Sequence, residues 1–183
     1  MDNRHSDAAP RVDRDGDESD DVLKLSTTNP DHLPTLSAPP PNSSLLVDEK
    51  FLYRTDQAGR VVSARAVLDR VDLQHPRDTT AQRKLVGKLP GDHAGHIFAR
   101  IFGGPIGTMN LVPMRGHQVN LSQYKTVENH WRRLIEQGEE VEVSVRLAYV
   151  GDAVRPHRIR LLYEWADGAE RIAIDNSPTE GAN

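Results

Sequence analysis

The stretch that decides the fold of this 183-residue chain is Gly91–Pro105, which reads GDHAGHIFARIFGGP. It is rich in glycine and histidine, and its apolar residues keep neither helical nor strand periodicity. A second short stretch, Asn110–Met114, reads NLVPM and predicts an extended piece ended by Pro113. These two stretches are the irregular centre around which regular elements are expected.

The clearest helix is predicted downstream, over Leu121–Gln137. Its apolar residues recur every three or four positions; they are Tyr124, Val127, Trp131, Leu134 and Ile135. Ser122 is the expected N-cap, and Gly138 ends the helix.

Strands are expected on both sides of the irregular centre. Upstream, 50–55 and 61–67 flank a Gly59 turn and predict a β-hairpin, whereas 71–91 is mostly loop. Downstream, 140–150, 159–165 and 171–174 alternate apolar and polar residues. The order indicates an α+β fold, with one main helix on a mainly antiparallel sheet.

Composition divides the chain near residue 45. Residues 1–45 hold nine acidic and four basic residues, six of the 12 prolines and no aromatic residue. Such a segment buries too little apolar surface to offset its ordering entropy, so we expect 1–45 to be a disordered, acidic, Pro-rich leader or linker. Residues 46–183 hold 19 basic and 18 acidic residues and all nine aromatics, enough for one compact domain.

The overall composition excludes several classes of protein. There is no cysteine, so a disulfide framework, a thiolate metal site and a thiol nucleophile are excluded. No apolar run approaches the ~18 residues of a membrane span, and no secretory signal peptide is visible. The formal charge of −4 argues against a nucleic-acid binder until the chain is divided, because the leader carries −5 and the remainder +1.

Taken together, GDHAGHIFARIFGGP, NLVPM, Asn120 and Glu128 eight residues later resemble the DNA/RNA non-specific endonucleases of the ββα-metal (His-Me finger) group. The branch that they resemble most is found as toxin domains of bacterial polymorphic toxins and secretion effectors. The resemblance covers roughly residues 47–175. It implies a ββα-metal core and the activity of a metal-dependent, non-specific endonuclease acting on DNA and, as a second candidate, RNA.

The resemblance also implies residue roles. His96 is the general base, Asn120 the Mg²⁺ ligand, with Mn²⁺ as a substitute metal, and Glu128 orients a metal-bound water. Asn110 fixes His96 or the loop. The chemistry of these residue types agrees, since an imidazole with a pKa near 6.5 suits a base and Mg²⁺ accepts a neutral carbonyl oxygen while keeping several waters.

One departure concerns the family signature DRGH, which reads HAGH at 93–96 here, so the arginine position is Ala94. The missing guanidinium would contact phosphate or transition-state charge. Arg100 is the best local substitute, with Arg115 and Lys125 as other candidates.

Several alternatives remain open at this point. Asn120 could cap the helix, Glu128 could pair with Arg132, and Asp92 could form a turn instead of acting in catalysis. A catalytically impaired nucleic-acid- or partner-binding module with the same fold is the alternative function. A zinc-dependent hydrolase is a third reading, but without cysteine the pair His93 and His96 would need a further ligand.

For a toxin domain, the resemblance implies further partners. We expect a cognate immunity protein, a secretion adaptor that recognises the N-terminal leader, and secretion or delivery into a target cell. No membrane partner is expected.

Overall fold

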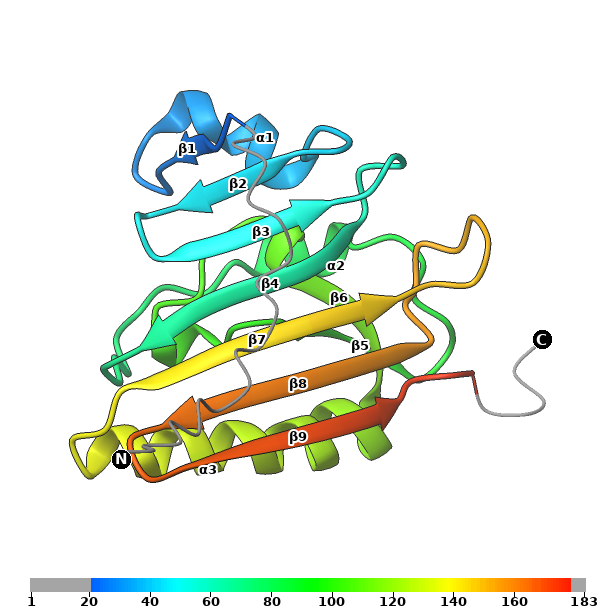
Figure 1. The fold of residues 1–183 in the computed structure, drawn as a ribbon. Helices are drawn as coiled ribbons and strands as arrows, with labels where there is room; N and C mark the ends of the chain where they lie inside the picture. The colour runs from blue at the N-terminus through cyan, green and yellow to red at the C-terminus, as the bar shows by residue number, and fades with distance from the viewer. Residues whose placement is uncertain (1–20, 179–183) are drawn as a thin grey trace, which may run out of the picture.

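The computed structural model describes residues 21–178, and its largest part is a seven-stranded sheet of order β1-β2-β3-β4-β7-β8-β9 (Figure 1). The strands are β1 (Leu23–Leu25), β2 (Ser44–Val47), β3 (Phe51–Thr55), β4 (Val61–Leu68), β7 (Val141–Ala148), β8 (Arg158–Trp165) and β9 (Gly168–Asp175). Only the pair β1–β2 is parallel. The predicted α+β class with a mainly antiparallel sheet is therefore confirmed.

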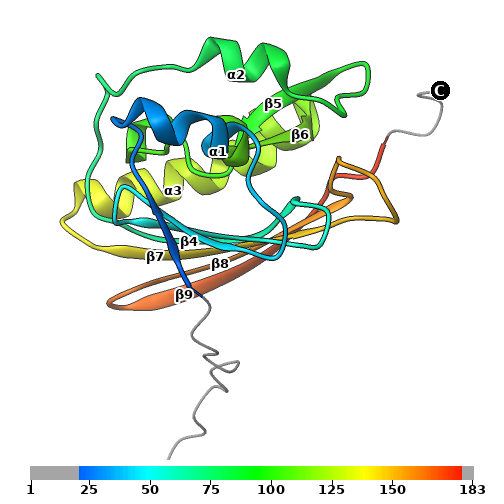
Figure 2. The ribbon, with the colours of Figure 1, turned by 90° about the horizontal axis from the view of Figure 1, so that it is seen from above.

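A second layer covers one face of this sheet. It contains the hairpin of β5 (Asp92–His96) and β6 (Leu111–Arg115), together with α1 (Leu33–Ser37), α2 (Thr79–Lys84) and α3 (Tyr124–Glu136). Figure 2 shows all of these elements on the same side of the sheet. None of the helices in residues 21–178 is long and apolar enough to cross a membrane.

The core lies between the two layers and centres on Trp131 of α3, which is fully buried. Its ring meets Phe102 at 5.9 Å, Tyr124 at 6.3 Å and Tyr163 at 5.8 Å between centroids, all edge-on. Edge-to-face contacts of this kind add to the burial of apolar area. The apolar stripe predicted for the main helix is thus the stripe that packs on the sheet.

The main helix begins differently from the prediction. Residues Gly116–Gln123 form a π-helical segment, α3 begins at Tyr124, and Ser122 makes no N-cap bond. Because the chain is already helical when it enters α3, the first amide groups of α3 have helical partners and need no capping side chain.

The expectation of a disordered leader is wrong for residues 21–45. These residues form β1, α1 and the first half of β2, and Leu25, Leu36 and Leu45 are almost fully buried. The backbone amide and hydroxyl of Thr27 both bond the carboxylate of Asp48. The composition averaged over 1–45 is dominated by the acidic residues before residue 22, so it does not reveal that the later leucines can be buried. Residues 1–20 lie outside the described part of the chain.

Candidate active site

The hairpin β5–β6 holds the histidine-rich motif, and its geometry depends on Gly95. A Cβ atom at this position would lie 2.4 Å from Sδ of Met114 and 2.9 Å from Oδ1 of Asn120. No other residue leaves that space open. Gly95 therefore lets the side chain of Asn120 rest directly against the backbone of β5.

Asn120 stands on the π-helical segment and faces the hairpin. Its Nδ2 donates to Nδ1 of His93 at 3.2 Å, so the side chain does not cap α3. Among residues 21–178 no group donates a hydrogen bond to its Oδ1. An amide oxygen held in place and left without a donor fits a hard cation such as Mg²⁺, which commonly keeps several waters beside one or two protein ligands.

An open hollow of about 460 Å³ lies beside Asn120. Its lining residues are Thr79, Gln82, Arg83, Lys88, Asp92, His93, Ala94 and Asn120. The hollow therefore combines the candidate metal ligand with two cations from α2 and the loop after it. His96 and Glu128 do not line it.

His96 is the last residue of β5, next to Gly95. Burial lowers the pKa of its imidazole below the ordinary 6.5, and the charges of Arg100 and Arg77 lower it further, while Asp78 acts in the opposite direction. The ring is therefore neutral at physiological pH, the state that a general base requires.

Asn110 is fully buried and makes four side-chain hydrogen bonds. Its Oδ1 accepts from Tyr53 Oη and the Phe98 amide, and its Nδ2 donates to the carbonyls of Phe98 and Pro105. The carbonyl of Asn110 also accepts from the Ile97 amide. These bonds fasten the loop that follows His96 to the central sheet, so Asn110 acts on the site by positioning.

Tyr124 fastens the same loop from the helix side. Its hydroxyl donates to the carbonyl of Ile97 at 2.6 Å. Burial raises the pKa of the phenol well above 10, so it remains a donor. The backbone on the C-terminal side of His96 is thus held by both layers of the fold.

Glu128 lies on α3 with only about a tenth of its surface exposed. Burial raises the pKa of its carboxyl group, and the charge of Lys125, whose Nζ lies 3.5 Å away, opposes this. The alternative pairing with Arg132 is absent, because Arg132 bonds Glu136 at 2.7 Å. A buried carboxylate whose ion-pair partner lies 3.5 Å away keeps the capacity to accept a proton or orient a water.

The candidate cations that were to replace the arginine at position 94 have other contacts. Arg100 donates to the carbonyls of Leu73 and His75, both at 2.8 Å. Arg115 lies near the C-terminal end of β9, where its Nη1 reaches the Ser177 carbonyl. Neither side chain lines the hollow, whereas Arg83 and Lys88 do.

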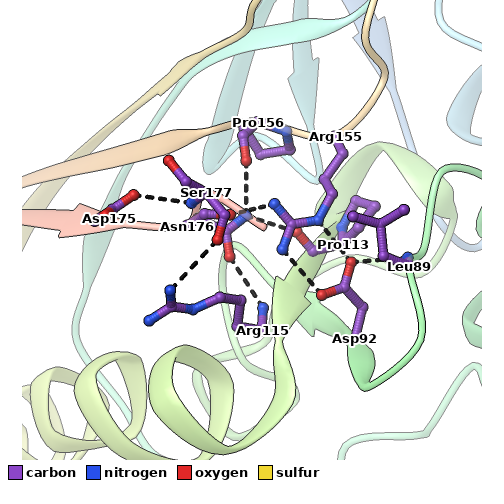
Figure 3. Close-up of polar contacts among 9 residues, drawn as sticks. All are labelled: Leu89, Asp92, Pro113, Arg115, Arg155, Pro156, Asp175, Asn176 and Ser177. Atoms are coloured by element: carbon purple, nitrogen blue, oxygen red, sulfur yellow. Dashed lines mark hydrogen bonds and ion pairs between the residues drawn. The ribbon is translucent and has the colours of Figure 1, made fainter. Parts of the chain in front are cut away.

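Asp92 forms a buried ion pair with Arg155, with Nε–Oδ2 at 2.6 Å and Nη2–Oδ1 at 2.9 Å (Figure 3). It also accepts from the Leu89 amide, so the turn-forming alternative holds. Arg155 further donates to the carbonyl of Asn176, and Asn176 bonds the Pro113 carbonyl and the Arg115 amide. This cluster joins β5 and β6 to the ends of the large sheet.

Three residues of the site were missed from the sequence. The sequence suggested His93 only as a partner of His96 in the zinc alternative, but in the structure it accepts a hydrogen bond from the side-chain amide of Asn120. Arg83 and Lys88 lay in a stretch expected to be mostly loop, yet Asp78 caps α2 there through the Ala81 amide. The basic residues shortly before the GDHAGH motif were the available signal.

The structure therefore brings Asn120, His93 and Gly95 together, with His96 next in the chain. No group of three or more His, Asp or Glu side chains placed to hold a metal occurs in residues 21–178. The hairpin β5–β6 followed by α3 is a ββα arrangement, with His96 at the end of β5 and Glu128 on α3.

Comparison with known proteins gives the family. Residues 41–167 match the model of the DNA/RNA non-specific endonuclease family, and the chain belongs to that family. Over 127 residues it is 32% identical to the type VII secretion system protein EssD of Staphylococcus aureus strain USA300. The match covers 62% of this chain and only 19% of that relative.

Solved structures share the fold. NucA from Streptococcus agalactiae without metal superposes with a TM-score of 0.55 at 20% identity, covering 70% of this chain and 71% of NucA. Its magnesium-bound form gives 0.50 at 20% identity, covering 65% and 68%. An extracellular endonuclease gives 0.51 at 18% identity, covering 72% and 80%.

Proposed function

We propose that this chain is a metal-dependent, non-specific endonuclease domain that hydrolyses phosphodiester bonds of DNA, with RNA as a second candidate substrate. The observation that carries the proposal is the free Oδ1 of Asn120, held against Gly95 by His93. The magnesium-bound form of the similar NucA structure supports a divalent metal as the cofactor.

Each residue then has a definite task. Asn120 binds the cation, and when bound the cation offsets the charge that develops on the phosphate. His96 takes the proton of the attacking water, since its lowered pKa keeps the ring neutral. Glu128 would hold a water when the metal is bound, and Asn110 and Tyr124 hold the backbone next to the base.

Arg83 and Lys88 bind the substrate phosphate in this proposal, in place of the arginine missing at Ala94. They line the same hollow as Ala94 and Asn120. The alternative function, an impaired binding module, draws its support from Ala94. Because Arg83 and Lys88 supply positive charge to the hollow, the missing arginine at Ala94 no longer argues for an impaired binding module.

The direct test is degradation of supercoiled plasmid by the purified chain in Mg²⁺, Mn²⁺ and EDTA. We expect cleavage only with a divalent metal, and His96→Ala should reduce the rate by about 10²–10⁴-fold. His130→Gln is the matched control, because His130 bonds Tyr163 and does not line the hollow. Cleavage by EDTA-treated protein would refute metal dependence, and wild-type cleavage by His96→Ala would refute the assigned base.

We further propose that the domain acts as an antibacterial effector toxin that is secreted or delivered into a target cell. The support is the relation to a type VII secretion system protein, of which the chain spans about a fifth. A cognate immunity protein that covers the hollow and a secretion adaptor that recognises the acidic N-terminal segment belong to the same proposal. Expression in a bacterial cytoplasm should arrest growth, and His96→Ala should not; harmless wild-type expression contradicts the toxin role.

A further inference from the structure

The large sheet has one covered face and one face that no described element covers. Figure 2 shows the helices and the β5–β6 hairpin on the covered side only. Alternate residues of β4, β7 and β8 point away from the core and are exposed or half-buried, as expected when an antiparallel sheet has one solvated face. We call this uncovered side the outer face.

Arginines dominate the middle of the outer face. The strand registers place Arg54 opposite Ser63, Ser63 opposite Arg146, and Arg146 opposite Arg160, which makes one row across four adjacent strands. Arg158 lies two residues before Arg160 on β8, and Arg171 lies in the next row on β9. All five arginines are exposed.

The contacts within residues 21–178 give no reason for Arg54, Arg160 and Arg171 on this face. Arg146 and Arg160 are direct cross-strand neighbours, so the row concentrates positive charge. Within residues 21–178, no ion pair within 4 Å involves Arg54, Arg160 or Arg171. The acidic side chains Glu142 and Glu164 pair opposite each other toward one end of β7 and β8, and Glu142 already bonds Arg65.

We propose that the outer face binds the phosphate backbone of nucleic acid, as a second contact surface separate from the hollow. The inference rests on nucleic acid being the substrate. From β3 to β9 the arginines span four strand spacings, about 19 Å. Duplex DNA presents one charge per ~1.7 Å of axis, so it can meet every arginine of the row without a matched sequence, and the guanidinium fork suits phosphate.

Such a surface would raise the affinity for long nucleic acid without taking part in bond cleavage. Within residues 21–178 the outer face carries no helix that could enter a groove and read bases, which agrees with non-specific binding through the backbone. It also gives a folded part with a charge near zero a local positive surface, in which Asp175 lies opposite Arg158, and Glu142 and Glu164 lie toward one end of β7 and β8.

The test measures binding of a fluorescent 30-base-pair DNA duplex to the full chain in EDTA, across a series of salt concentrations. The face variant is Arg54→Gln, Arg160→Gln and Arg171→Gln combined. The matched control is Arg70→Gln, Arg132→Gln and Arg133→Gln combined, which removes the same charge from positions off the outer face. Thermal unfolding of both variants verifies that they fold.

We expect the face variant to bind about tenfold more weakly at low salt. The slope of log Kobs against log salt should become shallower by about two to three, because each phosphate contact contributes about 0.9. The control should keep the wild-type slope. Equal losses in both variants would show an effect of bulk charge and overturn the proposal. Wild-type binding of poly-glutamate without salt-dependent binding of the duplex would overturn it in favour of an acidic protein partner.

A second readout separates this inference from the proposed function. With metal present, the face variant should cleave a short oligonucleotide at the wild-type rate while degrading plasmid more slowly. Parallel losses on both substrates would overturn the outer-face role while leaving the endonuclease intact. Failure of the wild-type chain to cleave any nucleic acid, with the EDTA binding difference preserved, would refute only the proposed function.

Discussion

Gly95 has no Cβ atom, and this leaves the space that the side chain of Asn120 occupies. Gly95→Ala would place a methyl group 2.4 Å from Met114 Sδ and 2.9 Å from Asn120 Oδ1. Overpacking of this kind costs about 1–3 kcal/mol of stability, and here it also displaces the candidate metal ligand. We therefore expect Gly95→Ala to lose most of its nuclease activity at a temperature where it is still folded. Ala94→Gly, a neighbouring change of one methyl group, is the control, and full activity of Gly95→Ala would contradict the assignment of Asn120.

His93 positions Asn120 by accepting its Nδ2 hydrogen. His93→Ala removes the acceptor, so we expect the dissociation constant for Mn²⁺, measured by calorimetry without substrate, to rise by about tenfold or more. His93→Gln keeps an acceptor oxygen and should recover part of the affinity. An unchanged constant in His93→Ala would show that His93 only fills space.

The lowered pKa of His96 fixes the sign of the pH dependence. Because burial and the nearby arginines disfavour the protonated ring, the base stays active as pH falls through 6.5 and is lost only below that value. We expect the acidic limb of kcat/KM against pH to have its midpoint below 6.5. A midpoint above 6.5 would mean that His96 is not the group whose ionisation limits the rate.

At the residue scale, the sequence pointed to His96, Asn120 and Glu128 because they belong to a spaced motif. It did not reveal His93 as a partner of Asn120, because the two positions are 27 residues apart and meet only when the π-helical segment folds back on β5. The pairing of Glu128 was equally invisible, since side chains at both i+3 and i+4 are within reach on a helix.

At the scale of elements, the cluster of Asp92, Arg155 and Asn176 joins the β5–β6 hairpin to the large sheet (Figure 3). Removing one partner leaves the other as a buried, uncompensated charge. Arg155→Met should therefore lower the free energy of unfolding by about 3–5 kcal/mol in urea titrations. Arg132→Met, whose partner Glu136 is half exposed, should cost at most about 0.5 kcal/mol.

The ionisation of Asp92 determines how the stability loss in Arg155→Met depends on pH. Burial disfavours its charged form, but the hydrogen bonds and charge of Arg155 prevail, so the pKa of Asp92 is lowered. The stabilisation by Asp92 is therefore present above the ordinary carboxyl pKa and is lost as pH falls through the lowered value. The gap between Arg155→Met and wild type should narrow in strong acid; a gap that is constant from pH 7 to pH 2 would contradict an ionic contribution.

Elements with clear periodicity were predicted well, and the bounds of the predicted strands agree with the structure to within a few residues. The strands after residue 140 and the apolar stripe of α3 follow their patterns. The start of α3 and the presence of α2 were missed, because a π-helical entry replaces the N-cap and α2 is only six residues long.

At the scale of the whole molecule, residues 21–45 belong to the folded domain. Three leucines in this segment are nearly or fully buried, each contributing roughly 1.5–3 kcal/mol. Deleting 1–45 should therefore lower stability by several kcal/mol and reduce activity at 37 °C, contrary to the expectation from sequence. Deleting 1–20 leaves all of the described packing in place and is the matched comparison. Equal chemical denaturation midpoints for the two truncations would contradict this role of 21–45.

The sequence by itself determined the class of fold, the family resemblance and the identity of the central motif. Periodicity and motif spacing are local properties, so they can be recognised from the order of residues alone. The tertiary structure decided that His93 bonds Asn120, that Arg83 and Lys88 line the hollow, and that Arg155 pairs with Asp92. It also decided that the arginines of β3, β7, β8 and β9 lie on one face of the sheet. Each of these depends on strand register or on contacts between distant segments, and only packing fixes those.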